Sequence, residues 1–284
     1  MKNRRDGNLV KNIDGMHVLM PYLKPKRCDS DVYINQKLDV TELVKYVEKK
    51  KKENPDIRLT YFHVFVTAIA KVVYNRPLLN RFVVNKRYYD RNNVSISFVA
   101  KGEFTDESKE FMSTIEIKEN DNLETIRNKV LNKVNKTRTN KNNSTDKAVD
   151  IVGKLPKFIR DIAMSVFLYM DRHDLLPNSL CEDNIYYSSV IVSNLGSIDC
   201  GAIYHNLTDF GTNSILATIG DIHKEQIITK DGKTEIRDIC EFGINLDERI
   251  ADGFYFVKSV KLLQEIFNNP ELLEKNASDK IEKN

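Results

Sequence analysis

The order of the apolar segments constrains the fold of this chain more than any other feature of its sequence. Residues 32–40 are rich in β-branched and aromatic side chains, as strands are, and lead directly into residues 41–48, whose apolar positions recur at helical spacing. Residues 60–74 predict a second helix with a broad, buried apolar face that ends at Pro77. Strands and helices continue to alternate, which predicts an α/β protein with one mixed sheet.

The remaining elements follow from the same two periodicities. Strands are expected at residues 82–89, 94–99, 111–117, 188–193, 214–219, 226–229, 235–239 and 242–246, and helices at residues 123–134, 155–170 and 254–267. The Asn/Lys-rich residues 135–147 predict a mobile loop. Residues 1–30 are polar and predict an extended N-terminal arm, and residues 274–284 predict a polar C-terminal tail.

Composition argues against several classes of function. Lys and Arg number 44 against 41 Asp and Glu, and this balance favours neither a nucleic-acid partner nor a membrane surface. The four cysteines lie far apart without a C-x-x-C pair, so neither a zinc site nor a disulfide scaffold is expected, and we expect no metal. The most apolar window, residues 158–168, is too short and too charged to span a bilayer, and no secretory signal is visible, so a cytoplasmic protein is expected.

A hydroxyl and an amide stand where the strongest predicted strand ends. Ser193 and Asn194 follow the apolar residues 190–192, and Gly196 permits a tight turn after them. Polar groups at the end of a buried strand need hydrogen-bond partners. Taken alone, these residues are better explained by an ordinary strand-ending turn than by a functional site.

Two further polar segments lie close to the predicted core. In residues 247–253, Asp252 can cap the last helix, but capping does not account for Glu248 and Arg249, which must be paired or lie at a cleft. His205 lies in a polar loop between two strands, where a histidine is either solvated or part of a site. His63 lies within the second predicted helix and is expected to be a satisfied core side chain.

Taken together, these motifs resemble the catalytic domain of dihydrolipoyl acyltransferases, the acyl-transferring component of 2-oxoacid dehydrogenase complexes, and its relative chloramphenicol acetyltransferase. The sequence S-N-L-G at residues 193–196 is followed by D-E-R-I-A-D-G at residues 247–253, which is similar to the family's D-H-R-x-x-D-G. Residues 38–43, 77–80 and 269–273 add matches in the same order. The resemblance runs from about Met20 to Leu273.

The resemblance implies a chloramphenicol acetyltransferase-like two-layer sandwich with a mixed β-sheet that forms a homotrimer. Its active sites would lie in channels between subunits, where coenzyme A enters from one side and a small-molecule acceptor from the other. An acyltransferase-like catalytic domain would span residues 31–273, with a loop and helix at residues 135–180 as an insertion. Acyl-CoA and the acceptor are the partners it implies, and no lipoyl attachment site is recognised in the chain.

The resemblance also assigns roles to individual residues. Ser193 matches the hydroxyl that hydrogen-bonds the tetrahedral oxyanion, and Asp252 matches the orienting, salt-bridging aspartate. Asn194, His205 and Arg249 are expected to contact the substrate, and His205 is a candidate for a displaced catalytic imidazole. We therefore expect these residues to surround one channel.

One substitution separates this chain from the family's pattern. Glu248 stands where the family has the histidine that acts as general base. A solvated glutamate is about two pKa units less basic than histidine; burial would raise its pKa, and pairing with Arg249 would lower it. Two hypotheses follow: an acyl-CoA-dependent acyltransferase in which Glu248 is a displaced base or polar anchor, or a catalytically silent trimer that binds coenzyme A or another ligand or serves as a scaffold.

Overall fold

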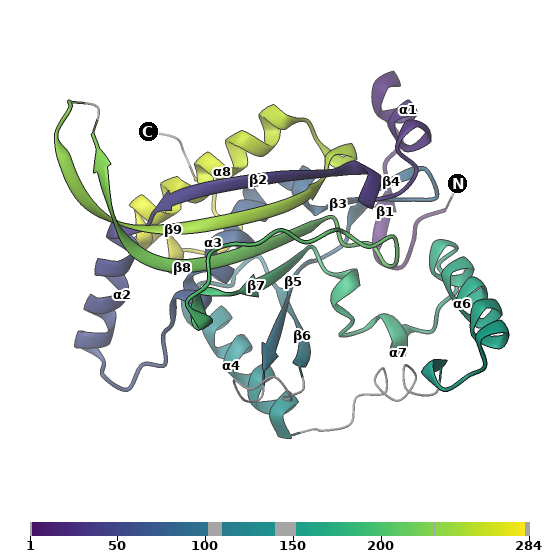
Figure 1. The fold of residues 1–284 in the computed structure, drawn as a ribbon, viewed down its shortest axis with the longest axis horizontal. Coiled ribbons are helices and arrows are strands. Elements are labelled where there is room, and N and C mark those ends of the chain that lie inside the picture. The colour runs from purple at the N-terminus through teal and green to yellow at the C-terminus, as the bar shows by residue number, and fades with distance from the viewer. Residues whose placement is uncertain (1, 102–109, 140–151, 230, 282–284) are drawn as a thin grey trace.

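The computed structural model describes residues 2–101, 110–139, 152–229 and 231–281 (Figure 1). Its centre is a six-stranded sheet. In spatial order its strands are β2 (Asp31–Asp39), β9 (Thr234–Asp247), β8 (Ile215–Ile228), β7 (Val190–Asn194), β5 (Val94–Lys101) and β6 (Glu110–Ile117). Strand β7 runs parallel to β5 and β8, and the other neighbours are antiparallel, so the predicted α/β fold with a mixed sheet is confirmed.

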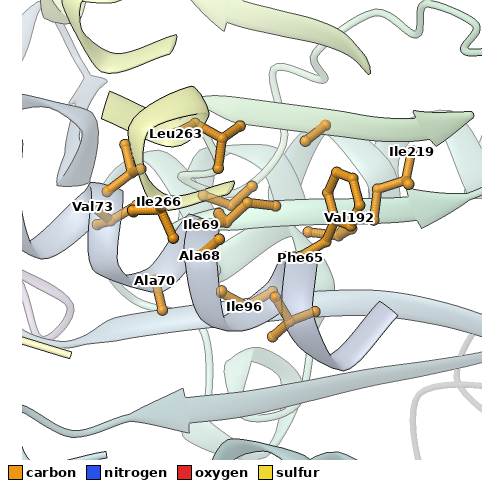
Figure 2. Packing of buried hydrophobic residues seen from close by; sticks show 14 of the residues in the cluster. Phe65, Ala68, Ile69, Ala70, Val73, Ile96, Val192, Ile219, Leu263 and Ile266 are labelled. Carbon is orange, nitrogen blue, oxygen red and sulfur yellow. The ribbon is translucent and has the colours of Figure 1, made fainter. Parts of the chain in front are cut away.

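Helices cover one face of the sheet and form the second layer (Figure 1). They are α2 (Thr41–Glu53), α3 (Tyr61–Asn75), α4 (Leu123–Thr139) and α8 (Gly253–Asn268). The apolar face of α3 predicted from the sequence is buried: Phe65 and Ala70 are fully enclosed. Figure 2 shows α3 side chains meeting Val192 and Ile219 of the sheet, with Leu263 and Ile266 alongside. The core therefore lies between the sheet and this helical layer.

His63 is the core side chain that the sequence predicts. It is 4% exposed, and its Nδ1 accepts a hydrogen bond from the Thr60 backbone N at 3.1 Å, completing the cap of α3. Burial lowers the pKa of the His63 imidazole to about 4. His63 is therefore a neutral, structural histidine at neutral pH.

A smaller three-stranded sheet lies beside the main one. Its strands are β1 (Gly7–Leu9), β4 (Arg87–Arg91) and β3 (Arg81–Val84), in that spatial order. The prediction of an extended arm over residues 1–30 is wrong, because this segment supplies β1 and helix α1 (Gly15–Leu23), which Asp14 caps. Helices α6 (Lys157–Arg172) and α7 (Asn178–Cys181) lie on the same side of the molecule (Figure 1).

Short 3₁₀ helices connect several elements. They lie at Cys28–Ser30, Pro77–Asn80, Ile185–Tyr187, Gly196–Ile198, Glu248–Ile250 and Pro270–Glu274. The predicted polar tail is not separate from the core, because Ala277 is fully buried. Residues 135–139 of the predicted loop are instead the last residues of α4, and residues 140–147 lie outside the described residues. No helix in the described part of the chain has the length and hydropathy needed to cross a bilayer.

Candidate functional site

Ser193 lies on the face of the sheet that the helices leave uncovered. Side chains alternate along β7, so that Val190 and Val192 enter the core while Ser193 points to the opposite, outer face. The side chain is half-buried. Its hydroxyl makes no hydrogen bond to the other described residues, which leaves it available to a ligand.

Polar side chains continue from Ser193 across the outer face. Thr218 of β8 is the register partner of Ser193, and Asn245 of β9 lies opposite Leu216, two residues earlier on β8. Thr218 and Asn245 are almost completely buried, yet Thr218 Oγ1 and Asn245 Nδ2 have no hydrogen-bond partner among the described residues. Buried polar groups of this kind are normally satisfied by protein, water or ligand. Sequence reasoning missed both residues, although Gly243, Asn245 and Asp247 repeat at the period of a strand face.

A polar loop crosses this outer face. The backbone of Ala202 approaches the sheet so closely that a Cβ at Gly220 would lie 2.7 Å from its nitrogen. The His205 backbone N donates to Asn245 Oδ1 at 3.1 Å, and the Tyr33 hydroxyl donates to Asn206 Oδ1 at 2.6 Å. The residue His205 therefore adjoins Asn245, but its side chain is exposed to solvent.

Arg249 forms a buried, two-contact ion pair with Asp247. Its Nε and Nη2 each donate to a different Asp247 oxygen at 2.8 Å, and its Nη1 donates to the carbonyls of Lys24 and Pro25 at 3.0 and 3.3 Å. Both side chains are buried. Because every guanidinium nitrogen is already engaged, Arg249 anchors the chain after β9 and does not have the free donors expected of a substrate contact.

Glu248 forms a different ion pair. Its Oε1 lies 2.5 Å from Lys24 Nζ, and both side chains are about one-third exposed, at 31% and 37%. Asp252 caps α8: its Oδ1 accepts a hydrogen bond from the Tyr255 backbone N at 2.7 Å. The helix-capping role of Asp252 considered from the sequence is therefore present in the structure.

Solved structures identify the fold. No family model and no curated protein matches this chain. A probable dihydrolipoamide acetyltransferase from Listeria monocytogenes matches with a TM-score of 0.60 at 18% identity, covering 93% of this chain and 95% of that one. The dihydrolipoamide acetyltransferase of Azotobacter vinelandii has a TM-score of 0.60 at 13% identity, with 93% of both chains covered. A chloramphenicol acetyltransferase has a TM-score of 0.57 at 11% identity and covers 92% of this chain and 99% of that one. The chain has the chloramphenicol acetyltransferase-like fold.

Within this acetyltransferase-like fold, the candidate residues do not meet in one chain. Ser193 is separated from the end of β9 by β8, and Glu248 lies five residues beyond Gly243, the β9 residue level with Ser193. Sheet spacings place their Cα atoms about 15–20 Å apart. Asn194 adjoins Ser193, whereas Arg249 and Asp252 belong with Glu248. Among the described residues, no three His, Cys, Asp or Glu side chains gather closely enough to hold a metal ion.

Asp31, the first residue of β2, binds the polar loop that crosses the outer face of the sheet. Its Oδ2 accepts a hydrogen bond from the Leu207 backbone N at 3.2 Å, while its buried Oδ1 has no hydrogen-bond partner among the described residues. Burial raises the pKa of the Asp31 carboxyl to about 6. The folded state therefore favours the protonated form and loses stability as pH rises from the unfolded value of about 4 through about 6.

Replacing Asp31 with asparagine should remove this pH-dependent loss, because the amide oxygen can still accept from Leu207 and carries no charge. The melting temperature of Asp31→Asn, relative to wild type, should be higher at about pH 7.5 than at about pH 4. Scanning calorimetry at the two pH values measures this difference. The same relative melting temperature at both values would contradict the raised pKa.

Proposed function

We propose that this chain is an acyltransferase that moves an acyl group between coenzyme A and a thiol, hydroxyl or amine of a small acceptor, and that it acts as a homotrimer. The observation that carries the proposal is Ser193, whose hydroxyl has no hydrogen-bond partner among the described residues and lies at the outer-face end of β7 in a fold shared with acyltransferases. Asn194 and His205 would contact the substrate. Arg249 and Asp252 would hold the segment that carries Glu248.

The proposed chemistry places a charge where Ser193 can stabilise it. The acceptor attacks the thioester carbonyl carbon, and a new bond to the acyl group forms while the carbonyl oxygen becomes an oxyanion. The Ser193 hydroxyl donates a hydrogen bond to that oxyanion. When the intermediate collapses, the carbon–sulfur bond breaks and coenzyme A leaves as a thiol. Glu248 takes the proton from the acceptor and returns it to the departing sulfur.

The separation of Ser193 from Glu248 supports a trimer. Groups about 15–20 Å apart in one chain cannot act on the same carbonyl, because catalytic groups need contacts of about 3 Å. We therefore propose that Glu248 of one copy faces Ser193 of the next. Light scattering should give the mass of three chains, and a monomer at working concentrations would contradict this arrangement.

Replacing Ser193 with alanine should lower turnover by about 10²–10³-fold, the usual cost of removing one oxyanion donor. Release of free coenzyme A from acetyl-CoA, followed with a thiol reagent across a panel of acceptors, measures the rate. Ser197→Ala is the matched control, because its exposed hydroxyl donates only to the Asn194 carbonyl. If both variants retain the wild-type rate, Ser193 does not stabilise the oxyanion.

The Lys24–Glu248 ion pair favours a second candidate function, a silent ligand-binding trimer. The Lys24 ammonium group lies 2.5 Å from Glu248 Oε1 and competes for that oxygen with any proton that the carboxylate would take from an acceptor. In the silent form, the same fold would bind coenzyme A without transferring an acyl group. Calorimetric titration with coenzyme A separates the two candidates, since binding without turnover of any acceptor supports the silent trimer.

A further inference from the structure

We propose that a pocket beside the β3–β4 turn binds the phosphate groups of a small molecule. Its volume is about 310 Å³, within the range of small-molecule sites. Residues 25–27, the turn between β3 and β4, the C-terminal end of α6 and Arg249 form its walls. The inference rests on the charges of this pocket and does not require acyl transfer.

Positive charge dominates the lining. The basic side chains are Lys26, Arg27, Lys86, Arg172 and Arg249, and the acidic ones are Asp171 and Asp209. Both acids are already hydrogen-bonded: Asp171 accepts from the Tyr187 hydroxyl and the Gly211 backbone N, and Asp209 accepts from the Arg27 backbone N. The basic side chains therefore outnumber the acids even without Arg249, whose charge Asp247 already balances.

Arg27 supplies a buried positive charge at the floor of the pocket. The side chain is 3% exposed, and its Nη atoms donate to the neutral carbonyls of Thr208, Val83 and Gly211. Its nearest carboxylate oxygen, Asp247 Oδ2, lies 3.9 Å from Nε and already binds Arg249. Arg27 Nε has no hydrogen-bond partner among the described residues. Asp247 thus serves two buried guanidinium groups, and the carboxylates of Asp171 and Asp209 supply further negative charge near Arg27. The positive charge that an anion can neutralise therefore lies mainly at the rim of the pocket.

The rim adds cations that have no acidic partner. Within the described ranges, Lys26, Lys86 and Arg172 form no ion pair. Lys86 Nζ instead lies 4.2 Å from the centre of the Tyr22 ring. Three unpaired cations around one opening match a ligand with several negative charges, as a phosphate or pyrophosphate has.

The C-terminal end of α6 does not oppose this assignment. Free carbonyls at a helix C-terminus carry partial negative charge and repel anions. Here Arg4 Nη1 donates to the carbonyls of both Asp171 and Arg172 at 3.3 Å, and Asn85 Nδ2 donates to the Arg172 carbonyl at 3.2 Å. The last carbonyls of the helix are therefore hydrogen-bonded before a ligand arrives.

The backbone at Lys86 is a second, independent sign of function. Asn85 and Lys86 form the two-residue turn between β3 and β4 and have φ values of 52° and 59°. Glycine is strongly preferred at the second position of such a turn, because a side chain there strains the left-handed conformation. A lysine that accepts this strain while facing the pocket is consistent with a role in binding.

Titration calorimetry at low salt tests the site with inorganic phosphate, ATP, coenzyme A, dephospho-coenzyme A and pantetheine. We expect the phosphate-bearing ligands to bind, and added NaCl should lower their affinity. Any binding of pantetheine, which has no phosphate group, should not depend on the charges at the rim. A much higher affinity for coenzyme A than for ATP or phosphate would identify the pocket as the phosphate end of the proposed acyl-CoA site. Equal binding of ATP and coenzyme A would identify a general phosphate site. Failure of all phosphate-bearing ligands to bind would overturn the inference.

Lys86→Gly separates binding from folding. It relieves the turn, so the melting temperature should rise by about 2–4 °C, while affinity for the phosphate ligand falls by about 2–5-fold. The double variant Lys26→Ala with Arg172→Ala should weaken binding by about 10-fold, because it removes two rim cations instead of one. Lys52→Ala, on the exposed end of α2, is the matched control and should change nothing. Unchanged affinity in both rim variants would overturn the assignment, whether or not acyl transfer is detected.

Discussion

Replacing Asp247 with asparagine should lower the free energy of unfolding by about 3–5 kcal/mol, because it leaves two buried arginines without their carboxylate. Asp247 is fully buried, binds Arg249 through both oxygens and lies 3.9 Å from Arg27 Nε. An amide keeps the size of the side chain but not its charge, so the loss reports the electrostatic role alone.

Urea denaturation followed by circular dichroism measures this loss. Asp238→Asn on the same strand is the matched control, because the side chain of Asp238 pairs with the exposed Lys224. A surface pair of that kind contributes about 0–1 kcal/mol. If Asp247→Asn lowers the free energy of unfolding no more than its control does, the ion pairs of Asp247 with Arg249 and Arg27 do not hold the segment after β9 in place.

Replacing Glu248 with glutamine should lower acyl transfer by about 10²–10⁴-fold, because glutamine cannot take up the proton of the acceptor. Glu248→His should raise turnover above wild type, since an imidazole is about two pKa units more basic than a solvated carboxylate. The histidine also cannot form the 2.5 Å ion pair with Lys24 that engages the native side chain. Thiol release from acetyl-CoA across several acceptors measures both variants.

Glu225→Gln is the control for these variants, because Glu225 is a carboxylate of β8 that pairs with Lys37, away from the residues of the proposed site. It should retain the wild-type rate. Equal rates for wild type and Glu248→Gln would remove Glu248 from the mechanism. In that case, coenzyme A binding measured by calorimetry would favour the silent trimer.

The strands and helices that could be predicted are those with a core beneath them. The apolar face of α3 and the alternation along β7 both reflect burial, and both elements form where the sequence indicates. Residues 82–89 are predicted as one strand but form a hairpin. The turn at Asn85 and Lys86 was not predicted, because it lacks the glycine that normally marks such a turn.

Where the core ends, the sequence pattern weakens. Four predicted strands are in fact two, β8 and β9, which continue beyond the core as a protruding two-stranded ribbon (Figure 1). The ladder of β8 shifts register between Ile219 and Ile222, at the polar residues that the sequence pattern treats as a break. Helix α1 was missed because nothing in its exposed, Pro-containing sequence suggests a buried stripe.

The candidate site shows a similar division. Ser193 could be chosen from its place at the end of an apolar strand, and the structure puts it on the outer face. The pairing of Glu248 with Lys24 could not be predicted, because the two residues come from opposite ends of the chain. Thr218 and Asn245 were missed because single polar residues within strands are common. Only the alignment of β7, β8 and β9 brings them beside the serine.

The pairing of β2 with β9 has a consequence for biosynthesis. Among the described residues, strand β2 lies at the edge of the sheet and pairs with β9, which is synthesised much later than β2: Asp31 pairs with Asp247. The nascent chain must therefore carry an unpaired β2 while the residues between the two strands are synthesised, and unpaired strands readily join other chains. Cotranslational chaperones should consequently bind the segment around Tyr33 and release it only after Asp247 has left the ribosome.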